Sequence, residues 1–205
     1  MKPSRSFALG AFLALAAAGP LAQDQSKTLF LVARPGMPDP NFRETVVLVT
    51  QDEQAQATGV IINRATNRSL AELLPSERFK RFTEPVFFGG PVALNGLFAV
   101  FRSEKLPGSA VTMLPGLHLA LDPNTIDALL SEPPANVRFY AGYSGWAPGQ
   151  LRGEIERGDW FVVDADADTV FRKDFSSLWQ EMVRRASGVH AGAGRETALR
   201  PRGPS

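Results

Sequence analysis

The stretch AGYSGWAPGQLRGEIERGDW, from Ala141 to Trp160, carries five glycines and three large aromatic residues around one predicted helix. Glycine weakens a helix or a strand unless the backbone needs its conformational freedom at that position. A segment with this composition therefore joins two elements tightly, forms a binding surface, or serves both purposes. Its interpretation decides how the flanking strands are connected and where a functional site is sought.

The second half of this stretch is predicted to be a helix from Pro148 to Arg157. Pro148 suits the first helical position, after Ala147 as the cap, because the N–H that proline lacks has no helical partner there. Trp146 before the cap and Leu151 in the helix can form a hydrophobic staple. Gly158 is placed where a helix ends through a left-handed residue.

The first half, Gly142 to Trp146, is predicted to be a loop, and two interpretations of it remain. In the first, its aromatic residues pack into the core, which is what buried aromatic side chains mostly do. In the second, the loop exposes backbone N–H groups at a helix N-terminus, which favours bound anions. The packing interpretation is preferred. The candidate binding residues under the second are Gly89, Gly90, Tyr143, Ser144, Trp146 and Gln150.

Apolar runs and turn residues divide the remaining chain into short elements. Strands are expected at 28–33, 44–50, 59–63, 85–88, 96–101, 111–113, 118–121, 137–141 and 160–163. Helices are expected at 69–74, 122–131 and 175–186, the first with Ser69 and Glu72 as a capping box and the second with Asp122 as its cap. Strands in groups of two or three between short helices predict a single α+β domain with a mixed sheet.

The first 22 residues have the three parts of a secretory signal. Lys2 and Arg5 form a basic start, a twelve-residue apolar run follows, and small residues end at Ala22. The apolar run is too short for a membrane anchor, which needs ~20 residues. We therefore expect a cleaved signal peptide at 1–22, a folded domain at 23–186 and a disordered tail at 187–205. The expected location is the periplasm or the exterior, with a cytoplasmic protein as the alternative.

The composition excludes several classes of site. The chain has no cysteine, which excludes disulfides, thiolate catalysis and cysteine-ligated metals. Without the signal, 20 basic side chains face 21 acidic ones, so the sequence does not predict an electrostatic surface for nucleic acid. The sequence predicts no cofactor and no metal site. The acidic run Asp164–Asp168 lacks the glycine and glutamate of a calcium loop and is interpreted as a solvated turn.

Ser144 is the one serine whose sequence context is similar to that of a catalytic nucleophile. The sequence GYSGW approaches the G-x-S-x-G elbow, but Trp146 stands where the final glycine is required. A catalytic serine also needs a histidine, and only His118 and His190 exist. His190 falls in the predicted tail, and His118 is interpreted as a partly buried strand residue. The sequence therefore does not predict a serine hydrolase.

Five segments in this order and spacing resemble the AlgH/YqgE family of bacterial proteins. They are MPDPNFRETVVLVT from Met37, TGVIINR from Thr58, FFGGPV from Phe87, GYSGWAPGQLRGEIERGDW from Gly142 and VFRKDFSSLWQEMV from Val170. The resemblance runs from Thr28 to Gly188. It implies a single domain with a coiled, partly barrel-like sheet and flanking short helices. It brings no established catalytic activity and no agreed catalytic residues.

The chain also departs from the pattern of that family. The family commonly has a histidine where this chain has Asp52, a glycine at Gln56, a proline at Ala65 and an acidic residue at Arg152. The name of the family comes from a proposed role in regulating alginate and virulence genes, and an exported member would not contact cytoplasmic DNA.

From these observations we predict a non-enzymatic binding or regulatory protein that acts on an unknown protein or small-molecule ligand. Two alternatives remain open. The first is a transcriptional regulator, as the family name suggests. The second is a hydrolase-type enzyme on small molecules, which would use Ser144, Asp52 or a carboxylate of the Glu154–Glu156 segment.

Overall fold

A ten-stranded sheet organises the part of the chain that the structure describes. The computed structural model describes residues 28–105 and 108–196. The strands are β1 (Leu29–Ala33), β2 (Val46–Gln51), β3 (Ala57–Ile61), β4 (Ala65–Ser69), β5 (Pro85–Phe88), β6 (Val92–Arg102), β7 (Val111–Leu114), β8 (Leu117–Ala120), β9 (Val137–Trp146) and β10 (Trp160–Asp164).

Strand β9 joins the two halves of this sheet. The main path of paired strands is β10-β1-β2-β3-β9-β6-β8-β7, and β4 and β5 branch from it at β9. The C-terminal end of β9 pairs antiparallel with β3, with Gly59 opposite Ser144. Its N-terminal part lies between antiparallel β6 and parallel β5. The sheet is therefore mixed, and the predicted α+β single-domain fold is confirmed.

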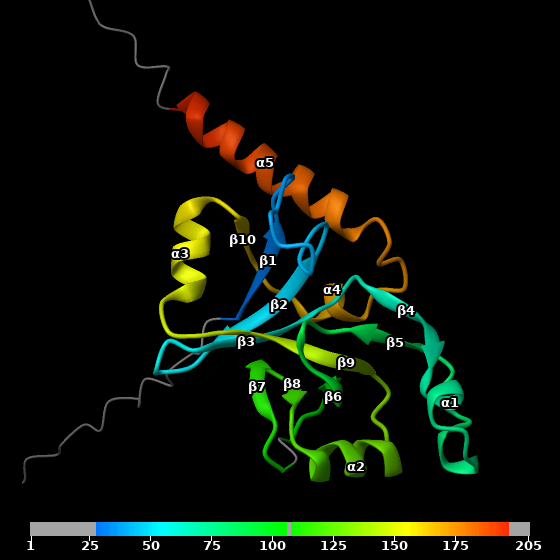
Figure 1. Cartoon of the computed structure of the whole chain (residues 1–205). Helices are drawn as coiled ribbons and strands as arrows, with labels where there is room; N and C mark the ends of the chain where they lie inside the picture. Colours follow the sequence, from blue (N-terminus) through cyan, green and yellow to red (C-terminus); the bar gives the residue numbers. More distant parts are fainter. Residues whose placement is uncertain (1–27, 106–107, 197–205) are drawn as a thin grey trace, which may run out of the picture.

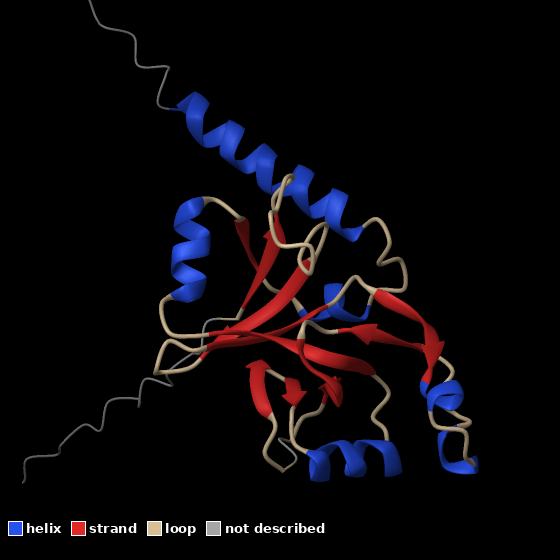
Figure 2. Cartoon of the chain, in the orientation of Figure 1, coloured by secondary structure: helices blue, strands red, loops and turns tan. Residues whose placement is uncertain are grey.

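Short helices flank the sheet (Figure 1). They are α1 (Leu70–Leu73), the 3-10 helix η1 (Glu77–Phe79), α2 (Pro123–Ser131), α3 (Gln150–Arg157), α4 (Ala167–Phe171) and α5 (Leu178–Glu196). Helix α5 packs on β1, β2 and β10, α3 packs on β10, and α2 packs on β6. Figure 2 shows the strands gathered in the centre, with the helices outside them.

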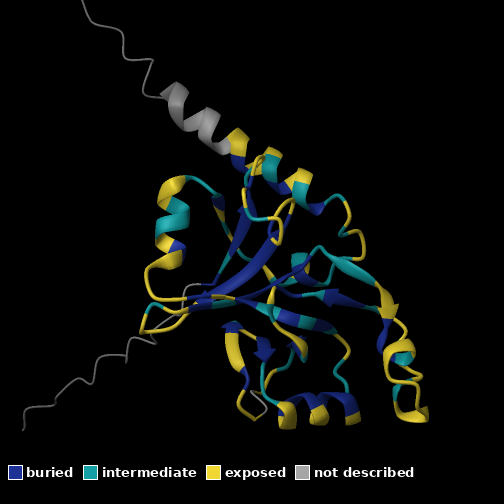
Figure 3. Cartoon of the chain, in the orientation of Figure 1, coloured by how far each residue is buried: buried dark blue, intermediate teal, exposed yellow. Residues whose placement is uncertain are grey.

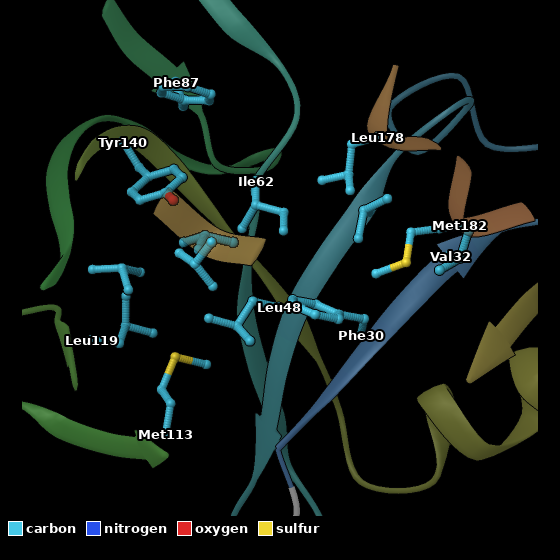
Figure 4. Close-up of a cluster of buried hydrophobic side chains, with 14 of the residues drawn as sticks. Phe30, Val32, Leu48, Ile62, Phe87, Met113, Leu119, Tyr140, Leu178 and Met182 are labelled. Atoms are coloured by element: carbon cyan, nitrogen blue, oxygen red, sulfur yellow. The ribbon is translucent and has the colours of Figure 1, made fainter. Parts of the chain in front are cut away.

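The central strands are buried on both faces, as their unbroken apolar runs predict. Along β1, Phe30 and Val32 belong to one hydrophobic cluster, whereas Leu31 and Ala33 belong to another. This alternation follows from the two-residue period of a strand. The first cluster also receives Leu178 from α5, as the close-up in Figure 4 shows. Figure 3 shows this dark buried centre and the exposed outer faces of the helices.

Two predicted helix caps are present. The Ser69 side chain accepts a hydrogen bond from the backbone N–H of Glu72, and the Glu72 carboxylate accepts one from the Ser69 backbone. The Ser69 backbone hydrogen bond lowers the pKa of the Glu72 carboxyl below its usual value. Asp122 caps α2 by accepting from the backbone of Thr125, and Pro123 lies in the first turn. Local sequence therefore determines where these two helices begin.

Two predictions for the opening stretch are wrong. Residues Gly142 to Trp146 are the second half of β9 and not a loop. Helix α3 begins at Gln150, with Gly149 as its cap in the left-handed region at φ +81°, so Ala147 and Pro148 precede it. Gly158 ends the helix in the left-handed region, as predicted. Because glycines usually mark loops, local composition did not reveal that this segment extends a strand.

Several element boundaries also differ from the predictions. Strand β4 and helix α4 were not predicted, and α4 lies in the acidic run that was interpreted as a turn, where Asp166 caps it. Helix α5 continues to Glu196, so the helix extends into the segment 187–205, for which a disordered tail was predicted. The packed first turns of α5 start this helix, and extending a started helix is easier than nucleating one, although the three glycines of 187–196 disfavour it. The predicted signal peptide lies outside the described residues.

A close backbone crossing joins β5 to β9. The Gly89 N–H donates to the Ala141 carbonyl at 2.9 Å, and the Gly89 carbonyl accepts from the Ile61 N–H at 2.9 Å. A Cβ atom built on Gly89 would lie 2.2 Å from the Gly142 carbonyl oxygen, and one built on Gly142 would lie 2.4 Å from the Gly90 carbonyl oxygen. These glycines are therefore required by mutual contact of main chains.

Two Gly→Ala substitutions, one at this crossing and one away from it, should have opposite effects on the free energy of unfolding. Gly89→Ala places a methyl group against backbone, which cannot move aside cheaply, and should lower the free energy of unfolding by about 3 kcal/mol or more. Gly153→Ala, in the middle of α3 with nothing within 4 Å of its Cβ position, should raise it by about 0.5–1 kcal/mol. Urea unfolding measures both, and an unchanged midpoint for Gly89→Ala would contradict the described crossing.

Candidate functional site

The six residues predicted as a binding surface do not form one surface in the structure. Gly89 and Gly90 lie at the buried crossing with β9. Ser144 is fully buried, and its hydroxyl donates to the Gly89 carbonyl at 2.9 Å. Its hydrogen bond fastens two strands, and no ligand reaches this hydroxyl while the crossing is intact.

Tyr143 is half-buried and packs against the first hydrophobic cluster. Its ring packs edge-on against Phe98, with 5.3 Å between the ring centroids. Its backbone lies opposite Val92 of β6. The side chain therefore supports the sheet at the point where β6 and β9 separate.

Trp146 and Gln150 belong to a second cluster on the other face of the sheet, built around Glu154. The indole N–H groups of Trp146 and Trp160 both donate to the same Glu154 oxygen at 2.9 Å. Gln150 donates to the other oxygen at 3.1 Å. Phe42 stacks on Trp146 and meets Trp160 edge-on. This arrangement fixes α3 to β9 and β10.

The structure brings no histidine to Ser144 among the residues whose side chains it describes. His118 lies on β8, where its Nε2 hydrogen-bonds the Ser103 carbonyl at 3.0 Å and its Nδ1 lies 3.3 Å from the Thr112 hydroxyl. Asp52, where the family commonly has histidine, accepts backbone N–H groups of Gln54 and Gln56 in the turn between β2 and β3. These groups are used in local structure.

A cavity of about 480 Å³ lies at the opposite end of β9 from Trp146 and is the best candidate for a site. Three separate parts of the chain form it: the segment from η1 into β5 together with Leu70 of α1, the segment that follows α2 and continues into the start of β9, and the segment from the end of α4 toward α5. We call it the arginine pocket. Its polar lining side chains include Arg81, Glu84, Arg138 and Lys173, and phenylalanines from each of these parts supply most of its apolar wall.

Arg138 is the most firmly held cation of the arginine pocket. Its guanidinium donates to the Val170 carbonyl at 2.5 Å and to the Arg172 carbonyl at 3.1 Å. It also lies over the ring of Phe87, 4.2 Å from the ring centroid, which is within the range of a cation–π interaction. Phe175 contacts it from another side, at 5.8 Å. These contacts fix both the charge and its orientation.

Arg81 is held in a similar way at another wall of the pocket. Its guanidinium donates to the carbonyls of Leu130 and Ser131, at the C-terminal end of α2. The guanidinium also lies 5.1 Å from the ring of Phe82. Lys173 and Glu84 are exposed, and no ion pair of either is found among the described residues.

Tyr140 lies behind the pocket wall, next to Phe87 (Figure 4). It is fully buried, and its hydroxyl makes no hydrogen bond of normal geometry within the described part of the chain. Burial raises the pKa of Tyr140 far above its ordinary value, and the charge of nearby Arg138 opposes this rise. The tyrosine therefore stays protonated and neutral beneath the cationic pocket.

A smaller cavity of about 330 Å³ lies between the 34–44 segment and Trp179 of α5. Its polar groups mainly hold that segment together. Arg43 donates to the Met37 and Pro38 carbonyls, and Trp179 donates to the Ala33 carbonyl. The arginine pocket is therefore the larger cavity and the one with more charged groups facing it.

Sequence reasoning missed every charged residue of the arginine pocket. The one local signal was Arg138, a cation between Val137 and Phe139 in an otherwise apolar strand. The other three stand in polar or irregular segments, where charged residues are ordinary. Their convergence depends on how three distant segments meet, which no spacing in the sequence encodes.

Comparison with known proteins gives the family. A family model described as AlgH-like matches residues 30–191. The chain belongs to the AlgH-like family. The match includes both the glycine crossing and the arginine pocket.

Relatives and solved structures of this family agree with that assignment. A UPF0301 protein of Chlorobaculum tepidum is 30% identical over 163 residues, which cover 78% of this chain and 86% of the relative. One of Myxococcus xanthus is 34% identical over 158 residues, covering 75% and 87%. The solution structure of the AlgH protein from Pseudomonas aeruginosa superposes with a TM-score of 0.64 at 26% identity, covering 91% of this chain and all of that one. These names state no ligand and no reaction.

Two further properties of the described residues bear on the class of site. No helix there is both long enough and apolar enough to cross a membrane. No group of three or more histidine, aspartate or glutamate side chains in that part of the chain could hold a metal ion.

Because Trp146 and Trp160 both donate to the Glu154 carboxylate, the loss of stability should depend on which residue replaces Glu154. Glu154→Ala leaves two indole N–H groups without their acceptor and should lower the free energy of unfolding by about 3 kcal/mol. Glu154→Gln keeps an oxygen that both indoles can reach and should cost about 1 kcal/mol. Urea unfolding followed by tryptophan fluorescence compares them.

The matched control is Glu156→Ala, on the exposed face of the same helix, which should change stability by less than about 0.5 kcal/mol. Equal losses for the alanine variants at 154 and 156 would show that the shared hydrogen bonds contribute nothing.

Proposed function

We propose that this AlgH-like protein is a non-enzymatic binding protein that holds a small organic molecule in the arginine pocket. The observation that carries the proposal is the convergence of three distant segments on one cavity, with fixed cations next to phenylalanine rings. Ligand pockets typically have volumes of about 300–1,000 Å³, mostly apolar linings and a few well-placed polar groups. The arginine pocket, at about 480 Å³, lies within this volume range and combines phenylalanine rings with a few fixed cations.

The chemistry of the lining supports binding in preference to catalysis. A nucleophilic or acid–base mechanism needs two groups with complementary roles at hydrogen-bond distance. In the described lining, Glu84 is the single carboxylate and Thr83 the single hydroxyl, and both are exposed. The two arginines donate to backbone carbonyls, which positions charge and transfers no proton.

The proposal includes export. The first 22 residues have the sequence of a secretory signal, so the protein would meet its ligand in the periplasm or outside the cell. This location separates it from a transcriptional regulator that contacts DNA directly. A regulatory role would then act through ligand capture.

Filling the pocket should abolish binding. Ala135 is an exposed residue of the lining, between α2 and β9. A tryptophan in its place would occupy the cavity without disturbing a buried contact. We expect fragments from a library of small aromatic and aliphatic molecules to give saturation-transfer NMR signals with the wild-type protein and to lose them with Ala135→Trp.

The control for this experiment is Ala128→Trp, on the exposed face of α2 and outside the pocket. It should retain the same fragment signals. If no fragment binds the wild-type protein, or if all hits bind both variants equally, the ligand-binding function of this pocket is wrong.

Export predicts a processed N-terminus. When the full chain is expressed in a Gram-negative host, we expect periplasmic protein beginning at Gln23. Leu15→Arg places a charge in the apolar run and should leave full-length protein in the cytoplasm, because signal sequences need an uncharged central region. Cell fractionation with N-terminal sequencing measures both. A cytoplasmic wild-type protein that still begins at Met1 would exclude export.

A further inference from the structure

We infer that the arginine pocket selects an organic anion, and specifically a carboxylate with an aromatic or aliphatic body. This inference rests on the proposed binding function and adds the chemical class of the ligand. It follows from how the cations of the pocket are held, from the balance of charge around the cavity, and from the character of its walls.

The two arginines of the pocket are held by uncharged groups. Arg81 donates to the last carbonyls of α2, and Arg138 donates to carbonyls of Val170 and Arg172 at the end of α4. Helix C-termini carry a partial negative charge of about half an elementary unit at most, which stabilises a cation without cancelling it. Both guanidinium groups therefore keep most of their positive charge while being fixed in place.

Four other arginines of the described chain pair with carboxylates: Arg78 with Asp127, Arg102 with Asp168, Arg157 with Asp159 and Arg172 with Glu181. Arg43 and Arg64 are instead held by backbone carbonyls, as Arg81 and Arg138 are. Among the described residues, no ion pair is found for the three cations that line the arginine pocket. The pocket is distinguished by the convergence of these cations on one cavity.

The net charge around the cavity is positive. Arg81, Arg138 and Lys173 contribute three positive charges, and Glu84 contributes the single negative one. The sequence as a whole has a net charge of only +1. A ligand carboxylate would therefore gain attraction from three side chains and meet repulsion from one exposed carboxylate, which the solvent screens.

Arg138 is suited to bind a carboxylate directly. A guanidinium has five N–H donors, and its two recorded hydrogen bonds to carbonyls use two of them. The side chain is half-buried and lies over the ring of Phe87, where reduced contact with water strengthens a charge-assisted hydrogen bond. It can accept a ligand without releasing the segment between α4 and α5.

The walls of the cavity indicate that the ligand has an apolar part. Phe139 is buried and packs edge-on against Phe82, with 5.4 Å between ring centroids. Phe171 and Phe175 line the other side, both half-buried. Burial of apolar ligand surface against such rings contributes about 25 cal/mol per Å². A bare inorganic anion would gain none of this, so we assign an amphipathic carboxylate.

Matched acid and amide probes test this assignment. Phenylacetate and phenylacetamide have nearly the same shape but differ in charge. In titrations of the full mature chain followed by NMR, we expect phenylacetate to bind at least about tenfold more tightly, because charged partners strengthen a hydrogen bond. Inorganic phosphate at the same concentration should compete much less well than a second aromatic carboxylate, benzoate.

Two exposed lining residues should shift phenylacetate affinity in opposite directions. Lys173→Gln removes an attraction and should weaken binding about threefold, whereas Glu84→Gln removes a repulsion and should strengthen it by a similar factor. Neither residue has an ion pair in the described part of the chain, so both variants should fold. Arg185→Gln, exposed on α5 and outside the pocket, is the matched control and should leave affinity unchanged.

The outcomes separate this inference from the proposed function. Equal affinity for the acid and the amide, or unchanged affinity in both lining variants, overturns the selection of anions. If phosphate competes as well as benzoate, the apolar part of the assignment is wrong. Binding of neutral fragments that Ala135→Trp abolishes, together with no binding of either carboxylate, would retain the pocket as a binding site and reject the anion. Loss of every signal would reject both.

Discussion

The contact on which the fold depends is the approach of the Gly89 main chain to β9. The Gly89 carbonyl accepts from the Ile61 N–H and from the Ser144 hydroxyl, and the Gly89 N–H donates to Ala141. The backbone of this one residue thereby connects β3, β5 and β9. The close distances leave no space for a Cβ atom, so the sequence at this point is constrained by main-chain geometry. Ser144, which first suggests a nucleophile, satisfies a backbone acceptor that would otherwise be buried with a single partner.

The crossing lies near the middle of β9. The two ends of this strand therefore carry residues into two regions that lie far apart in the protein. The C-terminal end of β9 carries Trp146 into the cluster around Glu154, and its N-terminal end carries Arg138 into the arginine pocket. Each end packs against a different face and a different set of helices. The pocket is therefore attached to the most extensively paired strand of the described sheet. A binding group placed on a rigid strand keeps its orientation better than one on a loop, which suits recognition by a fixed guanidinium.

Much of the fold could be predicted from local sequence, and the site could not. Alternation and apolar runs located most strands, and Ser69 and Asp122 marked helix starts because caps act over three residues. The GYSGW segment differs from the predicted loop because Gly142 is required by its contact with Gly89 and Gly90, more than fifty residues away along the chain. The pocket residues come from three segments, and of the charged ones only Arg138, in an apolar strand, stands out from its neighbours in the sequence. Their significance arises only when helix C-termini α2 and α4 bring carbonyl groups to Arg81 and Arg138.

The way these arginines are stabilised links fold to function. A cation can be fixed in a protein by a carboxylate, which cancels its charge, or by carbonyl dipoles, which preserve most of it. The ends of α2 and α4 have carbonyl groups without intrahelical partners. The arginines donate hydrogen bonds to these carbonyls, and the carbonyls in turn fix the orientation of the guanidinium groups. The charge that remains has no protein counterion in the described structure. A pocket built in this way is complete as a folded structure and keeps an excess of positive charge, which the anionic ligand that we propose would balance.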